Sequence, residues 1–301
     1  MFFPPEIACW RITSKCNRRC FFCYRPNAKD LNKKSVFKIV DKLVNAGVRG
    51  IGITGGEPLL RQDIAEIMKY MNKVGLKICL ATNLDFYKKY AKFINKYVDS
   101  IGIPFEGSSR EIHDSIRGAG SFANITQSLQ SIYDNSKIKI YITTVINKNN
   151  FSDVLNIGKL LVKYKDRVVL WKLYEVIKYV DDRPFQNIKG NQNFPSKIVK
   201  AQIKKLEKIF GENKIFYLSA KDRSAASFLI NPDGNVLLPK KFKDKTRDIL
   251  LGNLLRDKPI NIFKKWGNMI DYNKYQCHKC ALKCSQSCRQ LGNGAVSGII
   301  K

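Results

Sequence analysis

The sequence lacks the features of a membrane or secreted protein. No run approaches the roughly 20 consecutive apolar residues of a membrane-spanning helix. The first residues carry no basic segment of the kind that begins a signal peptide, and they contain the double proline Pro4-Pro5 and the acid Glu6. Nine cysteines in 301 residues are too few for a secreted disulfide scaffold. These absences predict a cytoplasmic protein that works in a reducing compartment and has no membrane partner.

Acidic residues are also scarce. The chain has 25 acids against 54 lysines and arginines, which gives a formal net charge of +29. Such an excess suits nucleic acid, a membrane surface or an acidic substrate. However, the lysines are spread along segments such as 197–208 and accompany abundant isoleucine and asparagine, a bias that an AT-rich genome would produce. We therefore do not expect nucleic acid as a partner.

Apolar residues recur at helix and strand spacing along the first 175 residues. Strands are expected at 6–13, 50–54, 77–82, 99–105, 138–146 and 167–175, and helices at 34–46, 61–74, 86–96, 121–134 and 153–164. Strands that alternate with helices of this length form βαβ units and a parallel sheet. The sequence therefore predicts an α/β domain over residues 1–180.

The apolar periodicity lapses after residue 178 into a stretch rich in Asp, Asn, Gly and Pro, which marks a boundary. A basic amphipathic helix is expected at 197–210. Two apolar segments, 224–230 and 235–238, flank Asn231-Pro232-Asp233-Gly234, which is typical of a hairpin turn. Residues 181–301 are therefore predicted to be a small extension with a hairpin and a cysteine-rich tail.

Three cysteines close to the N-terminus are spaced to hold metal. Cys16, Cys20 and Cys23 can converge from one loop, and thiolates are soft ligands that suit zinc, copper(I) and iron–sulfur clusters. A zinc site normally requires a fourth ligand nearby, but the next histidine is His113. Three cysteines without a local fourth suit a [4Fe–4S] cluster whose last iron stays open for a small molecule. A zinc knuckle or a chance cluster is the alternative.

Further polar and glycine-rich segments follow the other predicted strands. Gly55, Gly56, Glu57 and Pro58 come after the second strand, and Thr82-Asn83 comes after the third. Functional residues of parallel sheets gather at the carboxyl ends of the strands. We therefore expect these segments to face the cysteine loop.

The C-x3-C-x2-C spacing, with aromatic Phe22 before the last cysteine, resembles the signature of the radical S-adenosylmethionine (SAM) superfamily. The resemblance covers about residues 6–175 and implies a partial (β/α)6 TIM-like barrel. It also implies that the open iron chelates SAM, and that an electron from a donor such as flavodoxin or ferredoxin cleaves SAM. The product is a 5′-deoxyadenosyl radical, which abstracts hydrogen from a substrate.

The resemblance extends to residues that would contact SAM. Gly55-Gly56-Glu57-Pro58 looks like the family's GGEP motif, and Arg117 lies in a D-x-x-R-G segment, where it would pair with the SAM carboxylate. The cofactor-binding residues predicted in this way are Phe22, Gly55, Gly56, Glu57, Thr82, Asn83, Arg117 and Asn147. Pro104 and Glu106 depart from the family pattern and receive no role. His113 is expected to be a capping or surface residue.

The tail carries a second cysteine run, formed by Cys277, Cys280, Cys284 and Cys288. Its spacing is close to that of a ferredoxin, and it predicts an auxiliary [4Fe–4S] cluster. Four thiolates would satisfy tetrahedral zinc equally well. The region resembles a degenerate SPASM/twitch extension, in which Lys240 stands where relatives carry a cysteine. Cys9 and Cys79, within apolar strands, are expected to be core residues.

The predicted function is that of an iron–sulfur oxidoreductase of the radical SAM type. The extension and the D-x-x-R-G segment favour modification of a peptide or protein. Alternatively, Val145-Ile146-Asn147 and Trp171-Lys172 look somewhat like viperin and its prokaryotic relatives, which act on a nucleotide. A non-catalytic electron-transfer or nucleic-acid-binding protein is a third hypothesis, but it leaves Gly55 to Pro58 unexplained.

Overall fold

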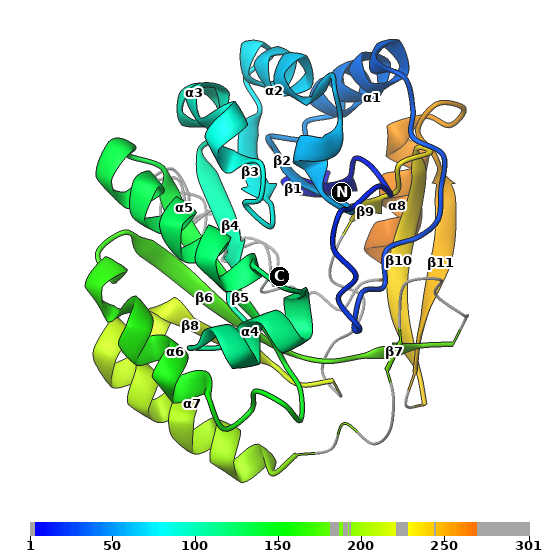
Figure 1. Ribbon diagram of the computed structural model, residues 1–301. Helices are drawn as coiled ribbons and strands as arrows, with labels where there is room; N and C mark the ends of the chain where they lie inside the picture. The colour runs from blue at the N-terminus through cyan, green and yellow to red at the C-terminus, as the bar shows by residue number, and fades with distance from the viewer. Residues whose placement is uncertain are drawn as a thin grey trace, which may run out of the picture.

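The computed structural model describes residues 4–180, 187–188, 192, 194–220, 228–243 and 245–269. Seven parallel strands form its main body, in the order β1-β2-β3-β4-β5-β6-β8. They are β1 (Ile7–Arg11), β2 (Gly50–Thr54), β3 (Lys77–Ala81), β4 (Ser100–Pro104), β5 (Lys139–Ile146), β6 (Val168–Glu175) and β8 (Ile215–Leu218). The sheet curves without closing, and helices cover its outer face (Figure 1). This arrangement is an open, partial α/β barrel, so the predicted fold class is confirmed.

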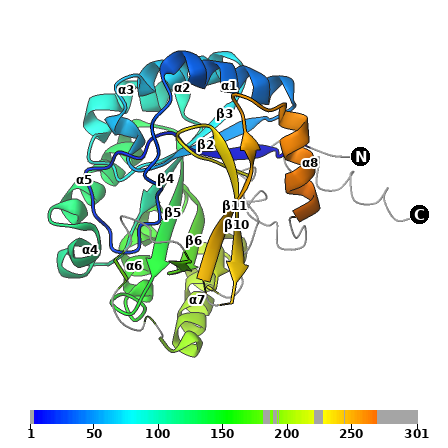
Figure 2. The same cartoon turned by 90° about the vertical axis from the view of Figure 1, so that its right-hand side faces the viewer.

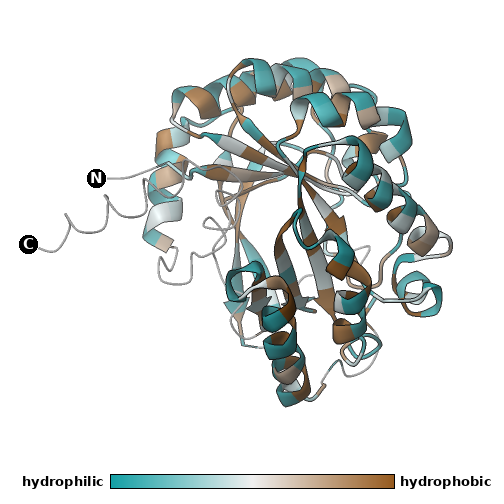
Figure 3. Ribbon diagram, turned by 90° about the vertical axis from the view of Figure 1, so that its left-hand side faces the viewer, coloured by the Kyte–Doolittle hydropathy of each residue, from teal (hydrophilic) through white to brown (hydrophobic). Residues whose placement is uncertain are grey.

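The connecting helices follow the predicted periodicity, except for the short helix at Arg110–Arg117, which was not predicted. They are α1 (Lys33–Asn45), α2 (Ile64–Lys73), α3 (Tyr87–Tyr97), α4 (Arg110–Arg117), α5 (Ser121–Asn135), α6 (Val154–Leu161) and α7 (Ser196–Phe210), with a short 3-10 turn, η1 (Pro58–Leu60), after β2. The side chain of Asn32 caps α1 by accepting a hydrogen bond from the amide of Ser35. Each helix turns its apolar side toward the sheet (Figure 3).

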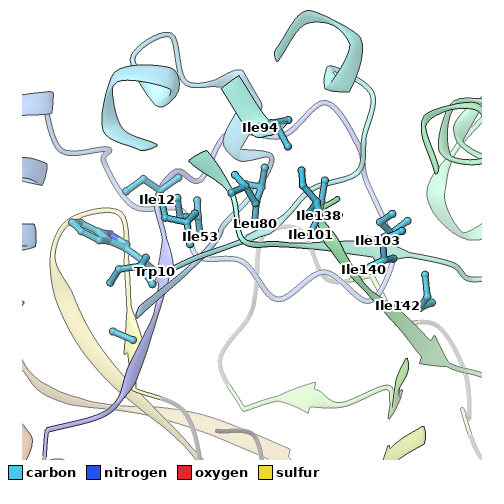
Figure 4. Close-up of a cluster of buried hydrophobic side chains, with 14 of the residues drawn as sticks. Trp10, Ile12, Ile53, Leu80, Ile94, Ile101, Ile103, Ile138, Ile140 and Ile142 are labelled. Atoms are coloured by element: carbon cyan, nitrogen blue, oxygen red, sulfur yellow. The ribbon is translucent and has the colours of Figure 1, made fainter. Parts of the chain in front are cut away.

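The two faces of the sheet carry different residues. On the outer face, large apolar side chains such as Trp10, Ile53 and Ile101 are fully buried against the helices (Figure 4). On the inner face of β2, β3 and β4 the residues are small, and they include Gly52, Ala81 and Gly102. Barrel interiors are normally filled by bulky branched side chains. Small residues therefore leave the inside of this barrel open.

The segment after the barrel extends the same sheet beyond β1. Strand β9 (Leu229–Ile230) pairs parallel to β1, and the antiparallel strands β10 (Asn235–Phe242) and β11 (Lys245–Asn253) follow. The short β7 (Lys178–Tyr179) pairs with β11, and α8 (Pro259–Met269) packs beside β11. Figure 2 shows this hairpin standing against the barrel edge. The predicted hairpin around residues 231–234 is confirmed.

Parallel strands continue past residue 180, because β8 pairs with β6. The division into domains 1–180 and 181–301 therefore stays a prediction. The tail cysteines 277, 280, 284 and 288 lie outside the described residues. Among the helices that are described, none is long and apolar enough to cross a bilayer.

Candidate active site

A cavity of about 460 Å³ opens at the carboxyl ends of the parallel strands. Its wall contains most of the residues predicted from the sequence, namely Cys16, Cys20, Phe22, Cys23, Gly55, Gly56, Thr82, Asn83 and Arg117. Glu57 and Asn147, which were predicted to contact the cofactor, are buried and are not part of this wall. The cysteine loop, the glycine pair and Arg117 thus meet around one space.

The two glycines seat the start of the cysteine loop. The amide of Gly56 donates to the carbonyl of Thr13 at 2.8 Å, and the amide of Glu57 donates to that of Lys15 at 2.7 Å. A Cβ atom on Gly56 would lie 2.0 Å from the Lys15 carbonyl oxygen, and one on Gly55 would lie 2.4 Å from that of Thr13. No side chain fits at either position, because backbone occupies the space.

An ion pair and an amide contact hold the rest of the loop. Arg18 binds both carboxylate oxygens of Asp85, at 2.6 and 2.7 Å, and the side chain of Asn83 donates to that of Asn17 at 2.9 Å. Bidentate pairing of this kind fixes orientation as well as distance. The loop after β1 is therefore attached to the segment that follows β3.

Glu57 organises the wall from behind. One of its carboxylate oxygens accepts from the amide of Leu59 and the hydroxyl of Thr82, and the other accepts from the amide of Asn83. Burial raises the pKa of Glu57 to about 7, although these three hydrogen bonds favour the carboxylate. The side chain caps η1 and joins the ends of β2 and β3, so it contacts protein rather than the cavity.

Arg117, the last residue of α4, reaches the cavity across buried Glu106. Its Nη2 lies 2.5 Å from Glu106 Oε1, and its guanidinium lies 5.3 Å from the centre of the Phe22 ring. Burial opposes the charge, but Cys20 and Glu106 more than offset this and raise the pKa of Arg117. A permanent cation thus faces the space beside Cys20.

His113 is fully buried, so the prediction of a capping or surface position was wrong. Its Nδ1 accepts a hydrogen bond from the amide of Glu106 at 3.2 Å, and its Nε2 lies 3.1 Å from the hydroxyl of Ser121. Burial lowers the pKa of His113 to about 3, and the charge of Arg117 acts in the same direction. The imidazole is neutral and fixes the chain after β4.

Asn147 closes the turn after β5. Its side chain donates to the carbonyl of Val145 at 3.0 Å and accepts from the amide of Asn149 at 2.9 Å. Both contacts satisfy backbone groups of the turn. The predicted contact with a cofactor ribose stays a prediction.

The three thiols of the loop suit an iron–sulfur cluster by their chemistry, because thiolates are its usual ligands. All three line the cavity, and within the described residues no group of three His, Cys, Asp or Glu side chains is placed to hold a single metal ion. A cubane takes each cysteine on a different iron. The amide of Arg18 donates to Cys16 Sγ at 3.4 Å, and Arg25 Nη1 lies 3.7 Å from Cys23 Sγ. Burial raises the pKa of Cys16 and of Cys20, and the amide of Arg18 opposes this at Cys16, so iron would displace the thiol protons when it binds.

Sequence reasoning missed part of the wall. Cys9 and Cys79 line the cavity, so their prediction as core residues was wrong, and Gly52 separates them in register. Five cations line it, and no Asp or Glu does so within the part of the chain that the structure describes; these cations are Arg11, Arg18, Arg25, Arg117 and Lys172. Arg11 and Lys172 lie on strands, where they alternate with buried apolar residues. That alternation could have placed both side chains on the cavity face of the sheet.

This arrangement, a thiol loop seated on a glycine turn at one end of a partial barrel, defines a radical enzyme scaffold. The family model for the radical SAM superfamily matches residues 10–161, half of the chain. The chain therefore belongs to the radical SAM superfamily, and the predicted family and enzyme class are confirmed. Enzymes of this superfamily use a [4Fe–4S] cluster together with SAM.

Among individual relatives, a probable GTP 3′,8-cyclase of Saccharolobus islandicus is 27% identical over 157 residues, which are 50% of this chain and 51% of the relative. The chain thus spans about half the length of the curated relatives that it matches. Two solved structures share the fold. The first is anSMEcpe with bound AdoMet and Cp18Cys peptide, which has a TM-score of 0.66 and 19% identity; the match covers 93% of this chain and 88% of that one. The second is Streptococcus suis SuiB bound to precursor peptide SuiA, which has a TM-score of 0.66 and 13% identity; the match covers 94% of this chain and 71% of that one.

The seat of the cysteine loop predicts the effect of Gly56→Ala. The new Cβ would collide with the Lys15 carbonyl, so we expect the loop to lift and the iron that it binds to fall to near zero. Iron and sulfide analysis after anaerobic reconstitution measures this. Gly75→Ala is the control: its φ of +85° strains a side chain by about 1–2 kcal/mol, but no atom lies within 4 Å of its Cβ position, so the loop should keep its iron. An unchanged iron content in the Gly56 variant would show that the seat is dispensable.

The buried imidazole predicts a pH dependence of stability. Above pH 6.5 His113 is neutral in both the folded and the unfolded chain. Below pH 6.5 the imidazole is protonated in the unfolded chain but stays neutral in the folded chain down to about pH 3, so the folded state loses stability as the pH falls. Replacing His113 with Asn should therefore remove about 2 kcal/mol of destabilisation at pH 5, at about 1.4 kcal/mol per pH unit. Urea unfolding of both metal-free proteins between pH 7.5 and 5 measures the difference. Parallel pH profiles would contradict a neutral His113.

Proposed function

We propose that this chain is a radical SAM enzyme that holds a [4Fe–4S] cluster on Cys16, Cys20 and Cys23. When bound, the cluster and SAM supply a 5′-deoxyadenosyl radical that abstracts hydrogen from a substrate. The observation that carries the proposal is the docking of the three-cysteine loop on Gly55 and Gly56 beside one shared cavity. That docking brings the three thiols and the glycine turn to the wall of the same cavity.

The chain's own residues would bind and orient SAM. Gly55 and Gly56 line the cavity and would hold the cofactor through their backbone, while the loop residues Thr13 and Lys15 fill the space that side chains would take. Arg117 would pair with the SAM carboxylate through its fork-shaped guanidinium. Phe22, which is 8% exposed, belongs to the same hydrophobic cluster as Cys20, and Cys23 packs against that cluster. Thr82 and Asn83 form the neighbouring wall and are already fixed by Glu57.

The substrate that we favour is a peptide or protein. In support, the likeness to the peptide-bound anSMEcpe and SuiB structures spans more than nine tenths of this chain and so includes the strands after the barrel. The tail cysteines Cys277, Cys280, Cys284 and Cys288 would hold an auxiliary [4Fe–4S] cluster near such a substrate, with zinc as the alternative. The electron would come from a flavodoxin or ferredoxin, and the protein would work in the cytoplasm.

A nucleotide is the second candidate, and the cations of the cavity wall favour it. Five cations and no described acid line the wall, and three of the cations, Arg11, Arg18 and Arg117, have carboxylate partners outside it. Guanidinium and ammonium donors suit a phosphate chain. Lys172 also extends over the ring of Tyr141, 4.8 Å from its centre, and both residues line the cavity. The relative from Saccharolobus islandicus carries the name of an enzyme that acts on GTP.

Removal of all three loop thiols tests the proposed chemistry. The variant Cys16→Ala/Cys20→Ala/Cys23→Ala should make no 5′-deoxyadenosine from SAM under reducing, oxygen-free conditions. Its metal content should fall to the share held by the tail. Chromatographic quantification of 5′-deoxyadenosine, with metal analysis of the same samples, gives both readouts. A variant that still cleaves SAM would exclude the loop as the cluster site.

Replacement of Arg117 tests the carboxylate contact. Arg117→Met should raise the KM for SAM about 10- to 100-fold, because hydrogen bonds to charged groups contribute roughly 1.5–3 kcal/mol. Arg110→Met is the matched control, since the Arg110 side chain lies on the same helix and is 75% exposed. Equal KM values for the two variants would remove Arg117 from the binding site.

The substrate class can be separated by turnover. Reconstituted protein, SAM and a reductant are incubated with GTP, with CTP or with a library of short peptides, and 5′-deoxyadenosine formation and the masses of the candidates are followed. A peptide that loses hydrogen and accelerates SAM cleavage supports the first candidate. Consumption of a nucleotide instead supports the second.

A further inference from the structure

Glu106, which departs from the family pattern, has all of its polar groups engaged by neighbouring elements. Its side chain is fully buried; Oε1 accepts from Arg117, and Oε2 accepts from the amide of Val145 at 2.7 Å. Its amide donates to His113 Nδ1, and its carbonyl accepts from Asn150 Nδ2 at 2.9 Å. The carboxylate therefore has one fixed position relative to α4 and β5.

The contacts of Arg117 leave only one edge of its guanidinium for a ligand. Glu106 takes the edge formed by Nε and Nη2, at 3.2 and 2.5 Å, and the Phe22 ring lies against the guanidinium at 5.3 Å. Nη1 donates to no group of the described residues, and Arg117 lines the cavity. The N–H groups of Nη1 are therefore the donors of Arg117 that a ligand in the cavity could use.

The pair also attaches α4 to the cysteine loop. Cys20, Phe22, Ile116 and Val176 form a small hydrophobic cluster separate from the main core, and Ile116 immediately precedes Arg117. Gly107 allows this approach, because a Cβ there would lie 2.6 Å from the amide nitrogen of His113. A buried guanidinium without its carboxylate would be strongly destabilising, so loss of Glu106 should loosen this packing.

We propose that Glu106 is a positioning residue that holds Arg117 against Phe22, so that the free guanidinium edge meets the carboxylate of SAM. The inference rests on the proposed function, since it assumes that SAM binds in this cavity. Glu106 itself does not touch the cofactor. It orients the residue that does, much as an outer partner orients a metal ligand.

The test compares SAM binding in reconstituted protein that carries Glu106→Ala, Glu106→Gln, Arg117→Met or Glu111→Gln. Equilibrium dialysis with labelled SAM measures the dissociation constant without turnover. Glu106→Ala should weaken binding roughly 10-fold, as loss of an orienting partner does in metal sites. Glu106→Gln should fall between the alanine variant and the wild type, because one amide oxygen can serve Arg117 or Val145 but not both. Glu111, exposed on the same helix, should have no effect.

A second readout needs neither SAM nor activity. Hydrogen–deuterium exchange of SAM-free protein should show faster exchange in residues 110–117 and 20–23 for Glu106→Ala, and wild-type exchange for Glu111→Gln. If both Glu106 variants bind SAM like the wild type while Arg117→Met binds weakly, Glu106 has no positioning role and the proposed function stands. If Arg117→Met also binds normally, the SAM contact itself is wrong and the inference fails with it.

Discussion

Two backbone hydrogen bonds, from the amides of Gly56 and Glu57 to the carbonyls of Thr13 and Lys15, determine where the cysteine loop lies. They act at a point where any side chain would collide with backbone, so the glycines are required by geometry before any ligand is considered. The ion pair of Arg18 with Asp85 and the network around Glu57 then fix the neighbouring strand ends. The cysteine loop is thus held in place by the protein itself.

The contrast between the two sheet faces explains how one strand set can provide both stability and a site. Outward residues such as Ile51, Ile53 and Leu80 are buried under helices and carry the hydrophobic stabilisation. Inward residues such as Gly52 and Gly102 contribute almost no volume. At Gly102 the saved space is used by the ring of Tyr141, since a Cβ would fall 2.1 Å from that ring. The cavity is therefore a product of residue size on alternate positions.

The sequence predicted the repeating part of this structure well. Six strands and five of the six α-helices of the first 175 residues follow from apolar periodicity, because each of these elements is amphipathic by itself, but the short helix α4 was missed. Local motifs also placed Cys16, Gly56 and Arg117 at the cavity, since parallel strands end at one edge. Strands β8 and β11 were missed, and so was α8. A short strand such as β8, which is partly exposed along its length, has little pattern of its own and forms because β6 offers an edge.

Single side chains were harder to predict than elements. Glu57, Glu106 and His113 are polar residues in full burial, and only their three-dimensional partners show whether they face a ligand or the protein. The resemblance to the GGEP motif assigned Glu57 to the cofactor, and His113 was expected at a surface or capping position. The structure instead gives Glu57 and His113 hydrogen-bond partners within the protein, and it gives Glu106 a partner, Arg117, that lies eleven residues away. Contacts of that kind depend on helix packing, which the sequence pattern does not encode.

The pairing of β9 with β1 has a consequence for the order in which the chain can mature. Strand β1 is synthesised before β9, yet Arg11 beside the cavity donates a hydrogen bond to Asn231, 220 residues later. Contacts over such sequence separations form slowly, because a long loop must close first. During synthesis, the β1 edge that β9 later covers stays exposed while the barrel strands assemble. If the cluster is inserted before β9 pairs with β1, the iron would reach a cavity whose wall is still open at the β1 edge. If it is inserted afterwards, the iron would reach the completed cavity.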